Sequence, residues 1–299
     1  MEGLSSAPEG APLLESPEKG RARAALTSPA GRKAHALNVV SAAVLGLLVL
    51  GILALVAADV WYVWRAGLSP AEIGRILAAP DVLRSMRMSV ATSLCTLLLV
   101  LCVSVPAGYA LSRLRFPGHA VVNALVDAPI VLPPVVVGVS LLAFFGTPLG
   151  DWIKEGLRAA DWSLASGIGI VICQFLMAVS YSLRANKAGF DAVDRRLEEV
   201  ALSLGCSPAQ AFLRVTLPLA RTSILAGSVM AWARAIGVFG PLMVFVGTGP
   251  RVMVMPTKIW LELSVGNIEV ALAVALVMLG MAGAALALVH VLAPGRSWG

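Results

Sequence analysis

The sequence predicts an all-α protein that crosses a membrane with six helices, and three observations carry this prediction. Hydrophobic residues make up 58% of the 299 positions, and the mean hydropathy is +0.86. Charged residues account for only 13%, whereas a soluble domain has about a quarter. Six apolar stretches are long enough to span a bilayer, because a helix needs about 20 apolar residues to cross the hydrocarbon core.

The first 35 residues differ from the rest of the chain, because Pro, Gly, Ser, Ala and charged residues dominate them. Such a segment buries too little apolar surface to offset the entropy that is lost on ordering. We therefore expect a disordered cytoplasmic tail over 1–35 and a transmembrane domain over 36–295. The apolar run after the tail is too long for the core of a signal peptide, so we expect it to be retained as a span.

The six expected spans follow in order at 37–63, 88–111, 122–146, 166–183, 222–247 and 268–293. The first ends with Trp61, Tyr62 and Trp64, which favour the membrane interface. Apolar residues at helical spacing in 65–87 indicate short amphipathic helices before the second span. An even number of spans puts both termini on one side. Fourteen Lys and Arg residues fall on that side and eight on the other, which indicates that both termini are cytoplasmic.

The longest inside loop, 184–221, has the sequence signals of two helices. Five apolar residues fall on one face of the first helix: Val193, Leu197, Val200, Ala201 and Leu204. Gly205 is placed to end this helix, since glycine adopts the left-handed conformation at little cost.

The second helix of the loop begins with a capping signal. Ser207 can cap it, Pro208 suits its first turn and Gln210 completes a capping box. This short helix presents Phe212, and Pro218 is expected to break the chain before the fifth span. The loop is either a solvated connection between spans or an ordered element that docks a soluble partner.

The same loop resembles the cytoplasmic loop of permeases from binding-protein-dependent ABC importers. The family pattern is Glu-Ala-Ala, three residues, Gly, nine residues, Ile, one residue and Leu-Pro. This chain matches its spacing, with Val200 and Val215 as mild departures. The resemblance implies coupling helices that enter a groove on a P-loop ATPase subunit. It assigns the ATPase contact to Glu199, Ala201, Gly205, Ser207, Pro208, Phe212 and Pro218.

The resemblance extends over about 82–290 and is most specific for the oxyanion branch of this family. The segment 113–118 follows the second span as it does in these permeases, and the segments 125–146 and 233–240 are similar to those of molybdate, tungstate and sulfate permeases. Val238 departs from the branch, which usually has Glu at this position. The resemblance implies an ABC importer permease architecture in the cell inner membrane, a substrate-binding protein outside and a second permease chain. One such loop per chain fits a homodimer, and a heterodimer with a related permease stays open.

Two spans hold the candidate residues of a transport path. Pro133 and Pro134 lie within the third span, where paired prolines make either a packing kink or a bend that lines the path. Arg234 lies about 18 Å along the fifth helix. We expect it to form a structural ion pair with Asp127 or Glu269, and the alternative is an oxyanion contact.

Two further intramembrane features complete the candidate path. Phe239 and Gly240 lie where glycines and a proline interrupt the fifth span, so they are a candidate gate. In the fourth span, Gln174 is expected to make a hydrogen bond between helices.

Several functions are not expected from this sequence. It has no G-x-x-x-x-G-K-[ST] motif, so ATP hydrolysis is expected on a partner chain. The four cysteines have no metal-binding spacing, and we expect no cofactor and no metal. Basic residues gather at the ends of apolar runs, so the net charge of +6 does not indicate nucleic acid. One alternative function is an ABC permease for another small solute. The other is an ion-coupled transporter, which usually needs several acidic residues in its spans, whereas Asp127 is nearly alone.

Overall fold

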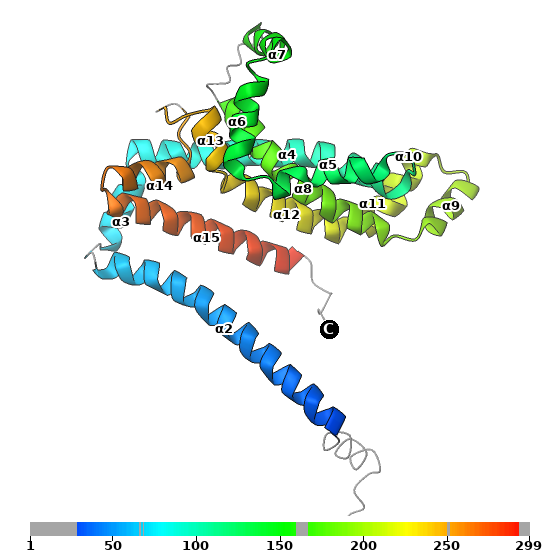
Figure 1. The fold of residues 1–299 in the computed structure, drawn as a ribbon, viewed down its shortest axis with the longest axis horizontal. Helices are drawn as coiled ribbons and strands as arrows, with labels where there is room; N and C mark the ends of the chain where they lie inside the picture. The colour runs from blue at the N-terminus through cyan, green and yellow to red at the C-terminus, as the bar shows by residue number, and fades with distance from the viewer. Residues whose placement is uncertain (1–28, 66, 68, 160–166, 250–251, 293–299) are drawn as a thin grey trace, which may run out of the picture. The chain divides into compact units, whose positions relative to one another are not determined.

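A computed structural model describes residues 29–65, 67, 69–159, 167–249 and 252–292, and every regular element in these ranges is a helix (Figure 1). Residues 1–28 of the tail expected over 1–35 lie outside these ranges. Helix α2 (Pro29–Arg65) begins ahead of the boundary expected at residue 35. Arg, Lys and Ala in 31–36 favour a helix, and a proline is well tolerated in the first turn.

The chain divides into a unit of residues 1–62 and a unit of residues 63–299. The first contains most of α2. The second contains all the other helices, which are α3 (Pro70–Ala78), α4 (Pro80–Arg113), α5 (His119–Val131), α6 (Pro134–Phe144), α7 (Pro148–Ala159), α8 (Gly167–Asp191), α9 (Arg195–Ser203), α10 (Pro208–Ala211), the π-helix η1 (Phe212–Thr216), α11 (Leu217–Leu219), α12 (Arg221–Ile236), α13 (Gly240–Phe245), α14 (Met255–Ser264) and α15 (Ile268–Leu292).

The described residues contain four single helices that are long and apolar enough to cross a membrane, or five spans if a bent pair counts as one. The single helices are Leu37–Arg65, Pro80–Arg113, Gly167–Asp191 and Ile268–Ala285. The bent pair is α5 and α6, with 112° between the two helices. The expected count of six is therefore not confirmed. The span expected at 222–247 is divided into α12 and α13, because Gly237 and Gly240 favour helix poorly and Pro241 lacks an amide donor.

Helix α8 packs against both α4 and α12 in the second unit, and α4 and α12 also contact each other. Polar side chains join α4 and α8 where both are buried: Thr96 Oγ1 donates to Gln174 Oε1 at 2.9 Å, and the hydroxyls of Ser104 and Ser182 are 2.9 Å apart. Asn186 Nδ2 also donates to Ser104 Oγ at 3.0 Å. The expected hydrogen bond from Gln174 to another helix is thus confirmed. Such bonds are typical contacts between membrane helices.

The segment 65–87 forms one separate short helix. Ser69 and Glu72 make a capping box at the start of α3, and Leu77 and Met86 pack against the buried apolar cluster that contains Val82. The rest of the segment is the first part of α4, which begins at Pro80 rather than at the expected residue 88.

The buried Lys258 on α14 also fixes this end of α4. Its Nζ lies 2.5 Å from both Asp81 Oδ2 and Glu262 Oε1. Since Lys258 is 5% exposed, these carboxylates supply the partners that a buried charge requires.

Candidate functional site

The loop between α8 and α12 is an ordered element rather than an irregular connection. Asp194 Oδ1 accepts from the Arg196 amide at 3.0 Å and caps the start of α9. Gly205 ends this helix with a φ of +90°. The Cys206 amide donates to Ala201 O at 3.1 Å and the Gly205 amide to Leu202 O at 3.0 Å. These two bonds form the Schellman arrangement that satisfies the last carbonyls of a helix.

The capping box expected at the second helix of the loop is present. The Gln210 amide donates to Ser207 Oγ at 3.3 Å, and the Ser207 amide donates to Gln210 Oε1 at 2.9 Å. Pro208 is the first residue of α10. The two ends of the α9–α10 connection are therefore fixed by local bonds.

The break expected at Pro218 is not found, because the chain stays helical from Pro208 to Leu219. The π-helix η1 ends at Thr216, two residues before Pro218, and contains the residue four positions before this proline. A proline ring clashes with the carbonyl four residues before it in an α-helix, and the wider π turn makes room for the ring. The turn before α12 instead lies at Ala220.

Phe212, for which the resemblance implies an ATPase contact, is half-buried beside aromatic side chains of α4 and α8. Its ring centroid is 4.6 Å from that of Tyr109 and 6.0 Å from that of Phe190. The side chain therefore packs the loop onto α4 and α8. The exposed residues around it are Ser207, Pro208, Ala209, Gln210, Leu213 and Arg214.

Glu198, not its neighbour Glu199, joins the loop to the membrane helices. Glu198 Oε1 accepts from Arg113 Nη2 at 2.6 Å, from Arg113 Nε at 2.9 Å and from Thr216 Oγ1 at 2.7 Å. Tyr109 Oη donates to Glu198 Oε2 at 3.0 Å. The side chains of Arg113 and Glu198 are only 10% and 13% exposed. One carboxylate thus ties α9 to α4 and to η1.

Sequence reasoning missed this network, although one signal was available. Glu198 precedes the buried Ala201 by three residues, so the two lie on the same face of α9. Glu199 is exposed. The acid that matches the family pattern is therefore on the surface, and the acid before it is an anchor.

The contacts of Glu198 also set its protonation. Burial raises the pKa of the Glu198 carboxyl, but hydrogen bonds from Arg113, Thr216 and Tyr109 outweigh this effect and hold the pKa below its usual 4.5. A carboxyl whose pKa is lower in the folded state stabilises that state above the unfolded pKa. This stabilisation is lost as the pH falls through the lowered folded pKa.

We expect a Glu198→Gln variant to lose less stability on acidification than the parent chain. The amide does not titrate, so this part of the pH dependence disappears. Thermal unfolding in detergent at a series of pH values from neutral to below 4.5 measures it. Equal acid dependence in both chains would contradict the assignment.

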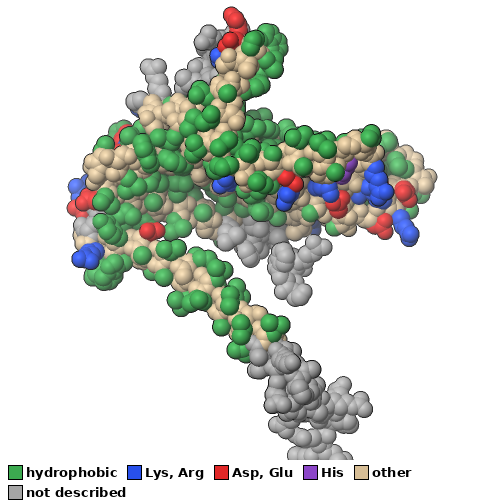
Figure 2. Space-filling model, in the orientation of Figure 1, with side chains coloured by type: hydrophobic (Ala, Val, Ile, Leu, Met, Phe, Trp, Pro, Cys, Tyr) green, Lys and Arg blue, Asp and Glu red, His purple; other side chains and the backbone are tan. Residues whose placement is uncertain are grey.

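The outer face of α9 exposes apolar side chains. Leu197, Val200 and Leu204 are 47%, 57% and 81% exposed. Figure 2 shows Lys and Arg side chains gathered at the same end of the helical unit. The exposed arginines there are Arg115, Arg195, Arg196, Arg214 and Arg221. This end therefore presents an ordered apolar face with basic residues around it.

The structure brings most of the candidate path residues to one cavity of about 310 Å³. Pro134, Arg234, Phe239 and Gly240 all line it. Pro133 directly precedes α6 and lies at the 112° bend. The cavity thus lies where α6 begins and where the helical run from α12 to α13 is interrupted.

The ion pair expected for Arg234 is not formed among the described residues. Arg184 Nε pairs with Asp127 Oδ1 at 2.6 Å instead, and no carboxylate of the described residues, Glu269 included, forms an ion pair with Arg234. The guanidinium of Arg234 lies 5.7 Å from the ring centroid of Tyr181. Its Nε is buried and has no hydrogen-bond partner.

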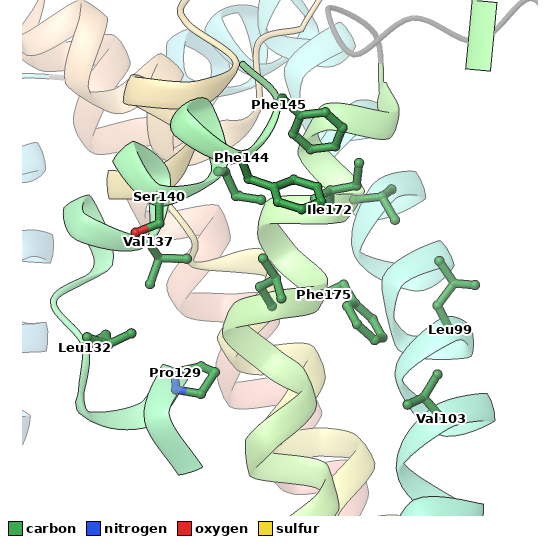
Figure 3. Close-up of a pocket in the computed structure, with 13 residues that line it drawn as sticks. Leu99, Val103, Pro129, Leu132, Val137, Ser140, Phe144, Phe145, Ile172 and Phe175 are labelled. Atoms are coloured by element: carbon green, nitrogen blue, oxygen red, sulfur yellow. The ribbon is translucent and has the colours of Figure 1, made fainter. Parts of the chain in front are cut away.

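A larger cavity of about 720 Å³ lies between α4, α8 and the bend from α5 to α6 (Figure 3). Leu99, Phe144, Ile172 and Phe175 are among its lining residues, and Ser140 is the one residue of its lining with a polar side chain. Sequence reasoning did not find this cavity. Its chemistry suits hydrocarbon and not an anion.

Comparison with known proteins identifies the family. Residues 102–297 match the model of the binding-protein-dependent transport system inner membrane component. The chain belongs to this family. It is a multi-pass membrane protein and a permease subunit, not the catalytic ATPase.

Two curated relatives of this permease have names that refer to molybdate/tungstate or molybdenum transport. It is 39% identical over 170 residues to the molybdate/tungstate transport system permease protein WtpB of Thermococcus kodakarensis, over 57% of this chain and 63% of the relative. It is 38% identical over 225 residues to a probable molybdenum ABC transporter permease protein of Haloferax volcanii, over 75% of this chain and 80% of the relative. The match thus spans just under two thirds of the Thermococcus protein.

A solved structure has the same fold. The permease superposes on a chain of a bacterial alginate ABC transporter, crystallised in complex with a periplasmic protein that holds an alginate pentasaccharide, with a TM-score of 0.65. The match covers 84% of this permease and 91% of that chain, at 16% sequence identity.

Proposed function

We propose that this permease forms the membrane path of an ABC importer for a tetrahedral oxyanion: molybdate, tungstate or sulfate. A separate P-loop ATPase drives transport, and a substrate-binding protein delivers the anion on the opposite side of the membrane. The ordered α9–α10 loop carries the proposal, because its exposed apolar face needs a partner. The names of the two curated relatives support the choice of anion.

The contacts of the loop support a coupling role. The ATPase binds the outer face of α9 and the exposed residues of α10, with Glu199 at the edge of the contact. Movement of α9 then reaches α4 through the bond from Glu198 to Arg113 and reaches η1 through Thr216. Helix α12, which follows this segment, ends beside the Arg234 cavity. ATP-driven displacement of the loop is thus transmitted to the helices that line the transport path.

The assembly contains two permease chains, two ATPase subunits and one binding protein, and a homodimer is its simplest form. The distribution of Lys and Arg along the sequence supports cytoplasmic termini and a cytoplasmic α9–α10 loop. The path comprises Pro133, Pro134, Arg234, Phe239 and Gly240. Ala201 and Phe212 pack the docking loop from inside, and the exposed Ser207 and Pro218 fix its helical path.

We expect Glu199→Ala and Gly205→Arg each to weaken association with the ATPase while the permease stays inserted. The first removes a charge from the docking face, and the second forces a bulky residue into a φ of +90°. Co-purification with the ATPase subunit measures the effect. Glu155→Ala changes an exposed acid on α7 and is the matched control. Recovery of the complex at the parental level after both changes would contradict docking through this loop.

Transport itself is tested in proteoliposomes that contain the permease, the ATPase and the binding protein. ATP-dependent uptake of labelled molybdate, tungstate or sulfate is the expected result. Uptake that needs an ion gradient and no ATP would contradict the proposal.

A further inference from the structure

The cavity of about 310 Å³ has one charged residue in its lining, and that residue is a cation. Arg234 reaches it from the last turn of α12, while Pro134 and Val135 reach it from the first turn of α6. The other lining residues are Met177, Gly237, Val238, Phe239, Gly240 and Pro241. The cavity is therefore apolar except where this guanidinium and the backbone meet it.

Arg234 lacks an internal counter-charge in the described residues. The acid of the third span, Asp127, is held by Arg184, and the buried Nε of Arg234 has no acceptor. Tyr181 offers only the face of its ring at 5.7 Å. An unneutralised cation among membrane helices is costly, and a planar guanidinium presents donors that match an oxyanion.

Helix α6 supplies a second group that favours an anion. Its first turn leaves backbone amides without intrahelical acceptors. The Val136 and Val137 amides donate to Pro133 O at 2.9 and 3.3 Å, and Pro134 has no amide hydrogen. The Val135 amide is therefore the one amide of this turn that is left to donate to a ligand. This helix has 11 residues, and the positive end of its dipole lies at the cavity.

Gly240 leaves this amide accessible. A Cβ at Gly240 would lie 3.4 Å from Val135 N and 3.3 Å from Pro134 Cβ. At Gly237, which lines the same cavity, the nearest atom to an added Cβ is Ala233 O at 3.5 Å. The two glycines therefore differ in whether a methyl group would cover the start of α6.

We propose that Arg234 and the Val135 amide bind the transported oxyanion inside the permease. This inference rests on the proposed function and names the groups that the anion meets. The site rejects cations through its charge. The two donors satisfy only part of the anion's hydrogen-bonding capacity, and water satisfies the rest. Such binding favours release of the anion over its retention.

Two matched pairs of variants test the site in ATP-driven proteoliposomes. We expect Arg234→Gln to lower the initial uptake rate by roughly ten- to a hundredfold, since one charge-assisted hydrogen bond is lost. Arg234→Lys keeps the charge and is expected to retain most of the rate. Gly240→Ala is expected to lower the rate about threefold, since its methyl group crowds the α6 amide, whereas Gly74→Ala, on α3 and with no atom within 4 Å of the added Cβ, is expected to match the parent.

The outcomes separate the site from the function. No ATP-dependent uptake by the parent complex would overturn both. Parental uptake with an equal rate in Arg234→Gln would overturn the site and leave the function standing. If Arg234→Gln does not assemble with the ATPase, the glycine pair decides, and equal rates for Gly240→Ala and Gly74→Ala overturn the site.

Discussion

Replacement of Glu198 by Ala is expected to detach the α9–α10 loop from the membrane helices and to uncouple ATP hydrolysis from transport. The change removes the acceptor for Arg113, Thr216 and Tyr109 at once. Arg113 is left as a cation whose side chain is 10% exposed. Loss of one partner of such a pair costs about 3 kcal/mol. The apparent melting temperature and the protease sensitivity of residues 195–216 measure the loss.

Glu199→Ala is the matched control, because it removes the same group one residue away. Glu199 is exposed, and a surface change of this kind shifts stability by about 0.5 kcal/mol or less. The two variants should therefore separate, with Glu198 affecting the stability of the loop and Glu199 affecting ATPase binding alone. Equal stability of the two would show that Glu198 is not the anchor.

Gly138→Ala is expected to reduce transport by more than about tenfold, because it forces α6 away from α13. A Cβ at Gly138 would lie 2.9 Å from Pro241 Cα and 3.0 Å from Pro241 O. These are backbone atoms, so no side-chain rotation relieves the clash. Overpacking of this kind costs about 1–3 kcal/mol. The displaced segments both line the Arg234 cavity, so the initial rate of ATP-driven uptake is the measurement.

Gly74→Ala is the control for this substitution. It lies on α3, and no atom lies within 4 Å of an added Cβ. Its transport rate should equal that of the parent. A parental rate in Gly138→Ala as well would show that the close approach of α6 and α13 is not needed for the path.

The features that the sequence predicted well are those set by local chemistry. Gly205, Ser207 and Gln210 end and begin their helices as expected, because a positive φ and a capping box depend only on nearby residues. Gln174 also has its expected bond to another helix, since a buried amide in a span needs a partner.

The features that it predicted poorly depend on which helices meet. Nothing in the local sequence shows that Arg184 rather than Arg234 reaches Asp127, or that Phe212 faces Tyr109. The expected span 222–247 combines α12 and α13, because the apolar composition continues through the interruption at Gly237, and this interruption itself was expected from the glycines and the proline. Pro218 was expected to break the helix, but the wider turn of the π-helix before it makes room for the proline ring.

The buried hydrogen bonds between α4 and α8 restrict how this permease can change shape. One set of bonds joins Thr96 to Gln174, and a second set, at another level of the same helix pair, joins Ser104 to Ser182 and Asn186. Axial sliding by one turn would break every one of these bonds inside lipid, where no water replaces them. The two helices are therefore expected to move together as one rigid body. When the permease opens, the other helices are expected to rotate relative to this rigid pair, at interfaces made of apolar contacts that can slide.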